Sequence, residues 1–253
     1  MSDIDVEIQT ACPHCQAPYQ PGDAFCQICG KELVVEPRDD FGDVFVPLRP
    51  VLLYYFMLLL VLALYKFTDS FPDGLAGMIV ITLVTVVITV AFTVESWATT
   101  RKLYSFSGVR WSILGLTIGG AMVGSLVVNM LCDFINASFH DDVFYNTYLF
   151  ADTPYPLLFA TLMIALEPAI FEEVAFRGFL FTSLARITKG VNAVYVSAFL
   201  FGIMHLSIIS LIWLVPIGIA FAELRRRYDT LWYGMAGHFV YNFCIVLYEY
   251  FGI

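Results

Sequence analysis

The chain has 253 residues, of which 59% are hydrophobic and only 14% are charged, and its formal net charge at pH 7 is −9. Soluble domains typically carry about 25% charged residues, so this much apolar surface cannot be hidden inside one soluble core. The acidic balance also excludes a nucleic-acid-binding surface, which needs clustered positive charge. The composition therefore predicts a polytopic membrane protein.

Residues 1–34 form a separate unit, which contains two C-x₂-C pairs: Cys12 with Cys15, and Cys26 with Cys29. Four thiolates in this arrangement typically bind one tetrahedral zinc ion. We predict a small zinc ribbon that folds as it binds its structural zinc. Two disulfides are the alternative, which a cytoplasmic location would disfavour because thiols there are kept reduced.

Residues 35–49 are charged and contain proline, so they are predicted to link the ribbon to a membrane domain at residues 50–253. The acidic start of the chain has no apolar signal segment, so we expect the first membrane span to direct insertion.

Seven apolar stretches follow, and most are long enough to cross about 30 Å of hydrocarbon. The fold class predicted is an all-α polytopic membrane protein with about seven transmembrane helices (six to eight), preceded by the small zinc ribbon. The predicted spans are residues 51–65, 75–94, 113–131, 156–187, 191–209, 211–224 and 231–250.

The basic residues predict the orientation of these spans, because Lys and Arg accumulate on the cytoplasmic side. With seven spans and the N-terminus inside, all Lys and Arg except Lys66 fall in cytoplasmic segments. We therefore expect the ribbon to lie in the cytoplasm.

Three polar motifs interrupt the apolar helices: Glu172-Glu173-x-x-x-Arg177, Phe201-x-x-x-His205 and His238-x-x-x-Asn242. Ionisable groups at membrane depth are costly, so they indicate a functional site by default. A structural polar network that holds the helices together is the alternative.

Helical spacing assigns positions within these motifs. Glu173 and Arg177 are i, i+4 neighbours that can pair, whereas Glu172 points about 100° away and is left as the free carboxylate. If the chain turns near residues 188–190, Glu172 and His205 lie at similar depths, about 21–22 Å from that turn. Pro168 should kink the first of these helices and open room for water.

Such groups are suited to hydrolysis. A Glu with a neighbouring His can deprotonate water, while a second His and an Asn can donate hydrogen bonds to the developing oxyanion. A second interpretation makes Glu172, His205 and His238 the ligands of a catalytic zinc, although the H-E-x-x-H spacing of zinc proteases is absent.

These motifs and their surroundings, at residues 172–180, 197–205 and 236–238, resemble the CAAX-protease and bacteriocin-processing family of intramembrane glutamic proteases. The resemblance covers about residues 167–242. It implies that Glu172 and His205 activate water, that His238 and Asn242 form the oxyanion site, and that Glu173 and Arg177 are a supporting pair. It also implies a catalytic site without a metal or other cofactor.

The resemblance implies an intramembrane endopeptidase that acts in the lipid bilayer on a membrane-embedded or membrane-associated protein or peptide. Eukaryotic family members cut a tripeptide from prenylated proteins, whereas prokaryotic members resemble peptidases for bacteriocin leaders, immunity proteins or regulators. The N-terminal composition and the ribbon favour the cytoplasmic (inner) membrane of a prokaryote, where the ribbon could contact a cytoplasmic protein. A catalytically idle immunity or scaffold protein is the third interpretation.

Overall fold

The structure is a computed structural model that describes residues 11–12, 14–19, 23, 25–26, 28–31, 33, 41–106, 108–139 and 146–252. The regular secondary structure of these residues is entirely helical. The predicted all-α fold class is therefore confirmed.

Among the described residues, three helices are long and apolar enough to cross a membrane: α1 (Phe41–Phe67), α2 (Gly74–Glu95) and α4 (Trp111–Phe139). Their apolar windows are only 17–22% buried, so most of this hydrophobic surface faces outward. Outward-facing apolar side chains on long helices are what a lipid environment requires. The short helix α3 (Trp97–Thr100) and the 3₁₀ turn η1 (Arg101–Tyr104) connect α2 to α4.

A 3₁₀ turn, η2 (Asn146–Phe150), precedes a continuous helical rod at residues 156–185. The rod alternates between α and π geometry: α5 (Pro156–Ala160), η3 (Thr161–Leu166), α6 (Glu167–Glu173), η4 (Val174–Leu180) and α7 (Phe181–Ala185), of which η3 and η4 are π-helical. Pro168 lies at the start of α6, where its missing N–H interrupts the regular hydrogen bonding. The rod thus departs from regular α-helical hydrogen bonding on both sides of α6. The predicted kink at Pro168 stays a prediction.

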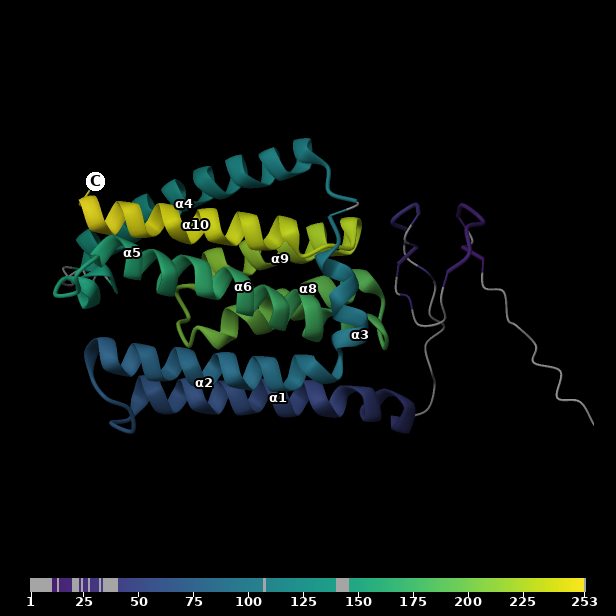
Figure 1. Ribbon diagram of the computed structural model, residues 1–253, viewed down its shortest axis with the longest axis horizontal. Coiled ribbons are helices and arrows are strands. Elements are labelled where there is room, and N and C mark those ends of the chain that lie inside the picture. Colours follow the sequence, from purple (N-terminus) through teal and green to yellow (C-terminus); the bar gives the residue numbers. More distant parts are fainter. Residues whose placement is uncertain are drawn as a thin grey trace, which may run out of the picture.

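The chain continues with α8 (Gly190–Met204), α9 (Leu211–Tyr228) and α10 (Trp232–Phe251). The long helices run roughly parallel to one axis, and the short helix α3 runs across it (Figure 1). In that view α1 and α2 form one side, α4 and α10 form the other, and the rod with α8 and α9 lies between them (Figure 1). The largest core cluster joins α1, the rod and α8 through side chains that include Tyr54, Phe179 and Phe201.

Two helix ends differ from the ends of the predicted spans. The helix α1 begins at Phe41, so residues 41–49 of the predicted linker are helical. The helix α8 ends at Met204, five residues before the predicted end, because Leu206 takes a left-handed conformation with φ 52°.

Seven long helical segments are present in the described part of the chain if residues 156–185 are taken as one. The helix α8 is apolar but has 15 residues, which gives about 22 Å and is too short to cross alone. The number of crossings beyond α1, α2 and α4 stays a prediction.

The ribbon lies beyond one end of the bundle, beside α3 (Figure 1). Phe25 of the ribbon is buried in the main core cluster and stacks on Phe181, with ring centroids 6.2 Å apart. The ribbon therefore packs directly on the helix that continues from the polar motifs.

Candidate active site and metal centre

The buried centre of the site is an ion pair between Glu173 and Arg177. Glu173 Oε1 lies 3.1 Å from Arg177 Nη1, and both side chains are almost fully buried. The guanidinium also lies over the ring of Phe201, 4.4 Å from its centroid, and Arg177 Nη2 donates to the Gly218 carbonyl at 3.4 Å. The pairing predicted from the i, i+4 spacing is present, and cation–π and backbone contacts complete it.

Glu173 also holds His238 on the neighbouring helix α10. Its Oε1 atom accepts a hydrogen bond from His238 Nδ1 at 3.3 Å. One carboxylate oxygen thus contacts both Arg177 and His238. Since Nδ1 carries the proton of this bond, the Nε2 edge of His238 is presented to the other side, where it lies 3.9 Å from Glu172 Oε2.

Gly234, one turn before His238, allows this arrangement. A Cβ atom at Gly234 would lie 2.3 Å from Glu173 Oε2, well inside van der Waals contact. The residue at this position must therefore be glycine if the carboxylate is to stay where it is. Gly234 is not among the residues predicted from the sequence, although a glycine one helical turn before a motif histidine was a visible signal.

Glu172 differs from Glu173 in both exposure and partners. Its side chain is 35% exposed, and among the described residues its Oε2 atom accepts no hydrogen bond. Glu172 lines a cavity of about 380 Å³ together with Lys66, His205 and Leu206. Of the two adjacent glutamates, Glu172 is thus the one that lines a cavity, while its Oε2 atom is buried beside His238 Nε2.

His205 is the residue that caps the C-terminus of α8, and it lines the same cavity as Glu172. Its Nδ1 atom lies 3.0 Å from the Phe201 carbonyl oxygen. Because a carbonyl oxygen only accepts hydrogen bonds, Nδ1 carries the proton. In the neutral imidazole, Nε2 then has a free lone pair and can accept a proton or a hydrogen bond. The structure thus brings two predicted residues from different helices to one cavity.

The side-chain amide of Asn242 is hydrogen-bonded away from Glu172, His205 and His238. Its Nδ2 atom donates to the Ile164 carbonyl in the π-helical segment η3, at 3.0 Å. In this geometry the amide fastens α10 to the rod, so a role as oxyanion donor requires that this bond be exchanged. The spacing of His238 and Asn242 could not have revealed this, because Ile164 is remote in sequence.

A second cavity, of about 310 Å³, extends from the site between α1, α2 and the rod. Its lining is largely apolar and shares Leu62, Tyr65, Glu172, Phe176 and Met204 with the first cavity. Glu167, the third carboxylate of α6 and one to which the sequence motifs give no role, also lines it. An apolar chain could therefore reach Glu172 from this side.

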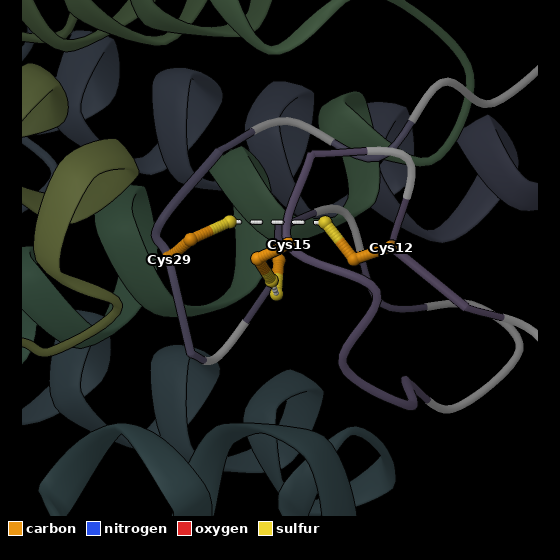
Figure 2. Close-up of side chains that lie close together, drawn as sticks. Cys12, Cys15 and Cys29 are labelled. Atoms are coloured by element: carbon orange, nitrogen blue, oxygen red, sulfur yellow. Dashed lines mark hydrogen bonds between the residues drawn. The ribbon is translucent and has the colours of Figure 1, made fainter.

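The four ribbon cysteines converge on one point, as Figure 2 shows for Cys12, Cys15 and Cys29. Their sulfur atoms all lie within 4.8 Å of one another, with Cys12 Sγ to Cys29 Sγ at 3.7 Å and Cys15 Sγ to Cys26 Sγ at 3.5 Å. Zn–S bonds of about 2.3 Å in a tetrahedron place sulfurs about 3.8 Å apart, whereas a disulfide needs about 2.05 Å. The geometry fits a metal and not a disulfide.

The backbone of the ribbon supports the thiolate form that a metal requires. Hydrogen bonds from the backbone amides of Cys29 and Ile28 lower the pKa of the Cys26 thiol to about 6, whereas burial and the neighbouring cysteines raise the pKa of the Cys15 thiol to about 12. The four sulfurs thus share their charge, and Cys26 is the thiol of this pair that ionises first. The Gln16 and Gly30 amides donate to the carbonyls of Cys12 and Cys26 at 2.9 and 2.8 Å, which closes a tight turn at each knuckle. The positions of the four cysteines therefore fit a structural metal site.

The ligands of the alternative catalytic zinc are arranged differently. A metal site brings the ligand atoms of three or more His, Cys, Asp or Glu residues close together. In the described part of the chain, the four cysteines meet this condition, with their sulfur atoms within 4.8 Å of one another. Glu172, His205 and His238 do not form such a group.

Comparisons with known proteins agree with this arrangement. Residues 154–244 match the family model described as Type II CAAX prenyl endopeptidase Rce1-like, and residues 12–33 match that of a zinc-ribbon domain. Searches of curated proteins and of solved structures gave no match. The first match includes all seven named residues of the polar motifs, and the second includes the four cysteines.

The chain thus combines a zinc ribbon with a CAAX-protease-like domain, and the predicted family resemblance is confirmed. Residues 154–244 are thus similar to an endopeptidase family, and together with the apolar helices this similarity supports an integral membrane protein.

Proposed function

We propose that the protein is a glutamic-type intramembrane endopeptidase in which Glu172 and His205 activate a water molecule. The observation that carries this proposal is the shared cavity: Glu172, with an unengaged carboxylate oxygen, and His205, with Nδ1 held by Phe201, line the same space from different helices. A carboxylate and an imidazole on one cavity are suited to general-base catalysis.

The reaction follows from these positions. Glu172 removes one proton from a water, whose oxygen forms a bond to the substrate carbonyl carbon, while the π electrons of the carbonyl move to its oxygen. His205 Nε2 accepts a hydrogen bond from the same water and orients it. When the tetrahedral intermediate collapses, the C–N bond breaks, and the leaving nitrogen takes the proton held by Glu172.

The intermediate oxyanion needs donors, which we assign to His238 and Asn242. His238 presents Nε2 toward Glu172, and this atom donates when the imidazole is protonated. Glu173 and Arg177 orient His238 from the far side. Asn242 takes part when substrate replaces its bond to Ile164.

The apolar cavity beside Glu172 supports a membrane-embedded or membrane-associated protein or peptide as substrate. We further propose a location in the inner membrane of a prokaryote with the ribbon in the cytoplasm. The basic loops support this orientation, since Arg110 and Arg227 lie at the ribbon end of the bundle, where they line a hollow with Cys26 and Cys29.

The proposal is tested by Glu172→Gln in the purified full-length protein. A quenched-fluorescence peptide library in liposomes identifies a peptide that the wild type cuts, and that peptide is then assayed with each variant. We expect Glu172→Gln to lose hydrolysis while its thermal unfolding stays near that of the wild type, because the side chain faces a cavity.

Glu173→Ala is the matched control. Removing one partner of a buried ion pair leaves a buried charge and typically costs about 3–5 kcal/mol, so this variant should lose stability as well as activity. Full activity of Glu172→Gln would overturn the proposed chemistry.

Metal content separates this mechanism from the metallopeptidase. We expect one zinc per chain in the wild type, held by the ribbon, and the same amount in His205→Ala. Two metals per chain, falling to one in His205→Ala, would establish zinc at the membrane site instead.

A further inference from the structure

The turn that follows α8 carries His205, and its conformation is unusual. Helices often end with glycine in the left-handed region, but here Leu206 occupies it with φ 52°. Leucine in this region is strained, so the surrounding structure must hold it there.

Lys66 makes the contacts that hold this turn. Its Nζ atom donates to the Leu206 carbonyl at 2.8 Å and to the His205 carbonyl at 3.4 Å. An ammonium group supplies three donors, and a cation is favoured at a helix C-terminus, where carbonyls are otherwise unpaired. Lys66 therefore closes the C-terminal end of α8 from outside that helix.

The contact comes from the last turn of α1, which is outside the CAAX-protease-like match at residues 154–244. A second bond joins the same two helices, since the Tyr55 hydroxyl donates to the Leu200 carbonyl at 3.2 Å. The helix α1 thus forms hydrogen bonds with the α8 backbone before Phe201 and with the turn after it. The Phe201 carbonyl itself accepts a hydrogen bond from the His205 ring.

Lys66 also lines the cavity that contains Glu172 and His205. The imidazole is fixed at one point by the Phe201 carbonyl, and its own backbone is fixed by Lys66. If the Lys66 contacts are lost, the strained Leu206 turn can relax, and the His205 ring moves relative to Glu172.

We infer that Lys66 is a positioning residue of the proposed active site, which holds the His205–Leu206 turn so that His205 Nε2 and Glu172 address the same water. This inference rests on the proposed function.

Lys66→Met and Lys66→Arg test it in the full-length protein, with the peptide that the wild type cuts as substrate. Small displacements of reacting groups cost up to about 10²-fold in rate, so we expect Lys66→Met to lower kcat by about that factor with little change in KM. Lys66→Arg should restore most of kcat, because a guanidinium also donates to carbonyls. The matched control is Lys189→Met, an exposed lysine at the other end of α8, which should behave as the wild type.

A readout without proteolysis distinguishes this inference from the proposed function. The rate at which diethyl pyrocarbonate modifies His205, measured by peptide mass spectrometry, should change in Lys66→Met and not in Lys189→Met. If Glu172→Gln stays active while this rate still changes in Lys66→Met, the proposed function fails and the positioning contact stands. If kcat and the modification rate of Lys66→Met both equal those of the wild type, the inference is overturned.

Discussion

The two adjacent glutamates, Glu172 and Glu173, have opposite environments because a helix turns about 100° between them. Glu173 points inward, where one of its oxygens contacts both Arg177 and His238. Glu172 points to the cavity and keeps an oxygen without a hydrogen-bond partner in the described structure. A chemical role thus suits Glu172, and a role in positioning His238 suits Glu173.

Gly234→Ala tests how tightly the Glu173 carboxylate is confined. The added Cβ would lie 2.3 Å from Glu173 Oε2, so the carboxylate must move away from Arg177 and His238. Overpacking of this kind typically costs about 1–3 kcal/mol, and we expect lower thermal stability together with loss of peptide hydrolysis.

Gly119→Ala is the control, because a Cβ at this helical glycine meets no atom within 4 Å. Gly119→Ala should keep activity and stabilise α4 slightly, because the helical propensity of alanine exceeds that of glycine by about 1 kcal/mol. Equal unfolding temperatures and activities of the two variants would contradict the confinement of Glu173.

At the scale of elements, the ribbon repeats one turn at its two knuckles with different residues. Gln16 and Gly30 both have positive φ, 61° and 68°, and both donate to the first cysteine of their knuckle. The second turn packs on the helical domain, where a Cβ at Gly30 would lie 2.9 Å from the Arg227 carbonyl oxygen. Gly30 therefore meets two requirements: a backbone with positive φ, and close packing of that backbone against the Arg227 carbonyl.

Gly30→Ala should separate these two roles. Alanine at positive φ is strained, and its Cβ presses on the backbone at Arg227, so we expect the ribbon to pack less closely and to be cleaved faster in limited proteolysis. Gln16→Ala keeps an existing Cβ and should show wild-type cleavage. Wild-type cleavage of Gly30→Ala would show that the ribbon does not rest on Arg227.

At the scale of the whole molecule, a line of contacts joins the ribbon to the polar motifs. Phe25 stacks on Phe181, whose ring lies 5.5 Å from the Arg225 guanidinium carbon. Arg225 Nε in turn donates to the Arg177 carbonyl at 3.2 Å. The ribbon is thus packed against the same helices that hold the buried ion pair.

Phe25→Ala should detach the ribbon without removing its metal. Phe25 is 4% exposed, and truncation of a buried phenylalanine typically costs about 3–5 kcal/mol. We expect a lower unfolding temperature and faster proteolytic release of the ribbon, with zinc still at one equivalent. Ile28→Ala, at a position that is 75% exposed, should leave both measurements unchanged. Loss of zinc in Phe25→Ala would instead place Phe25 inside the folding unit of the ribbon alone.

The sequence by itself determined the membrane class, the metal-binding ribbon and the Glu173–Arg177 pair. Each of these depends on composition or on spacing along the chain, and helix pitch converts an i, i+4 spacing directly into proximity.

Only the tertiary structure decided the partners that lie far apart in sequence. The structure shows that His238 is hydrogen-bonded to Glu173 and that Asn242 is hydrogen-bonded to the Ile164 carbonyl. It also shows that α8 ends at Met204 and that Lys66 is hydrogen-bonded to the turn that follows. These contacts depend on how helices pack and rotate against one another, which spacing within a single helix does not encode.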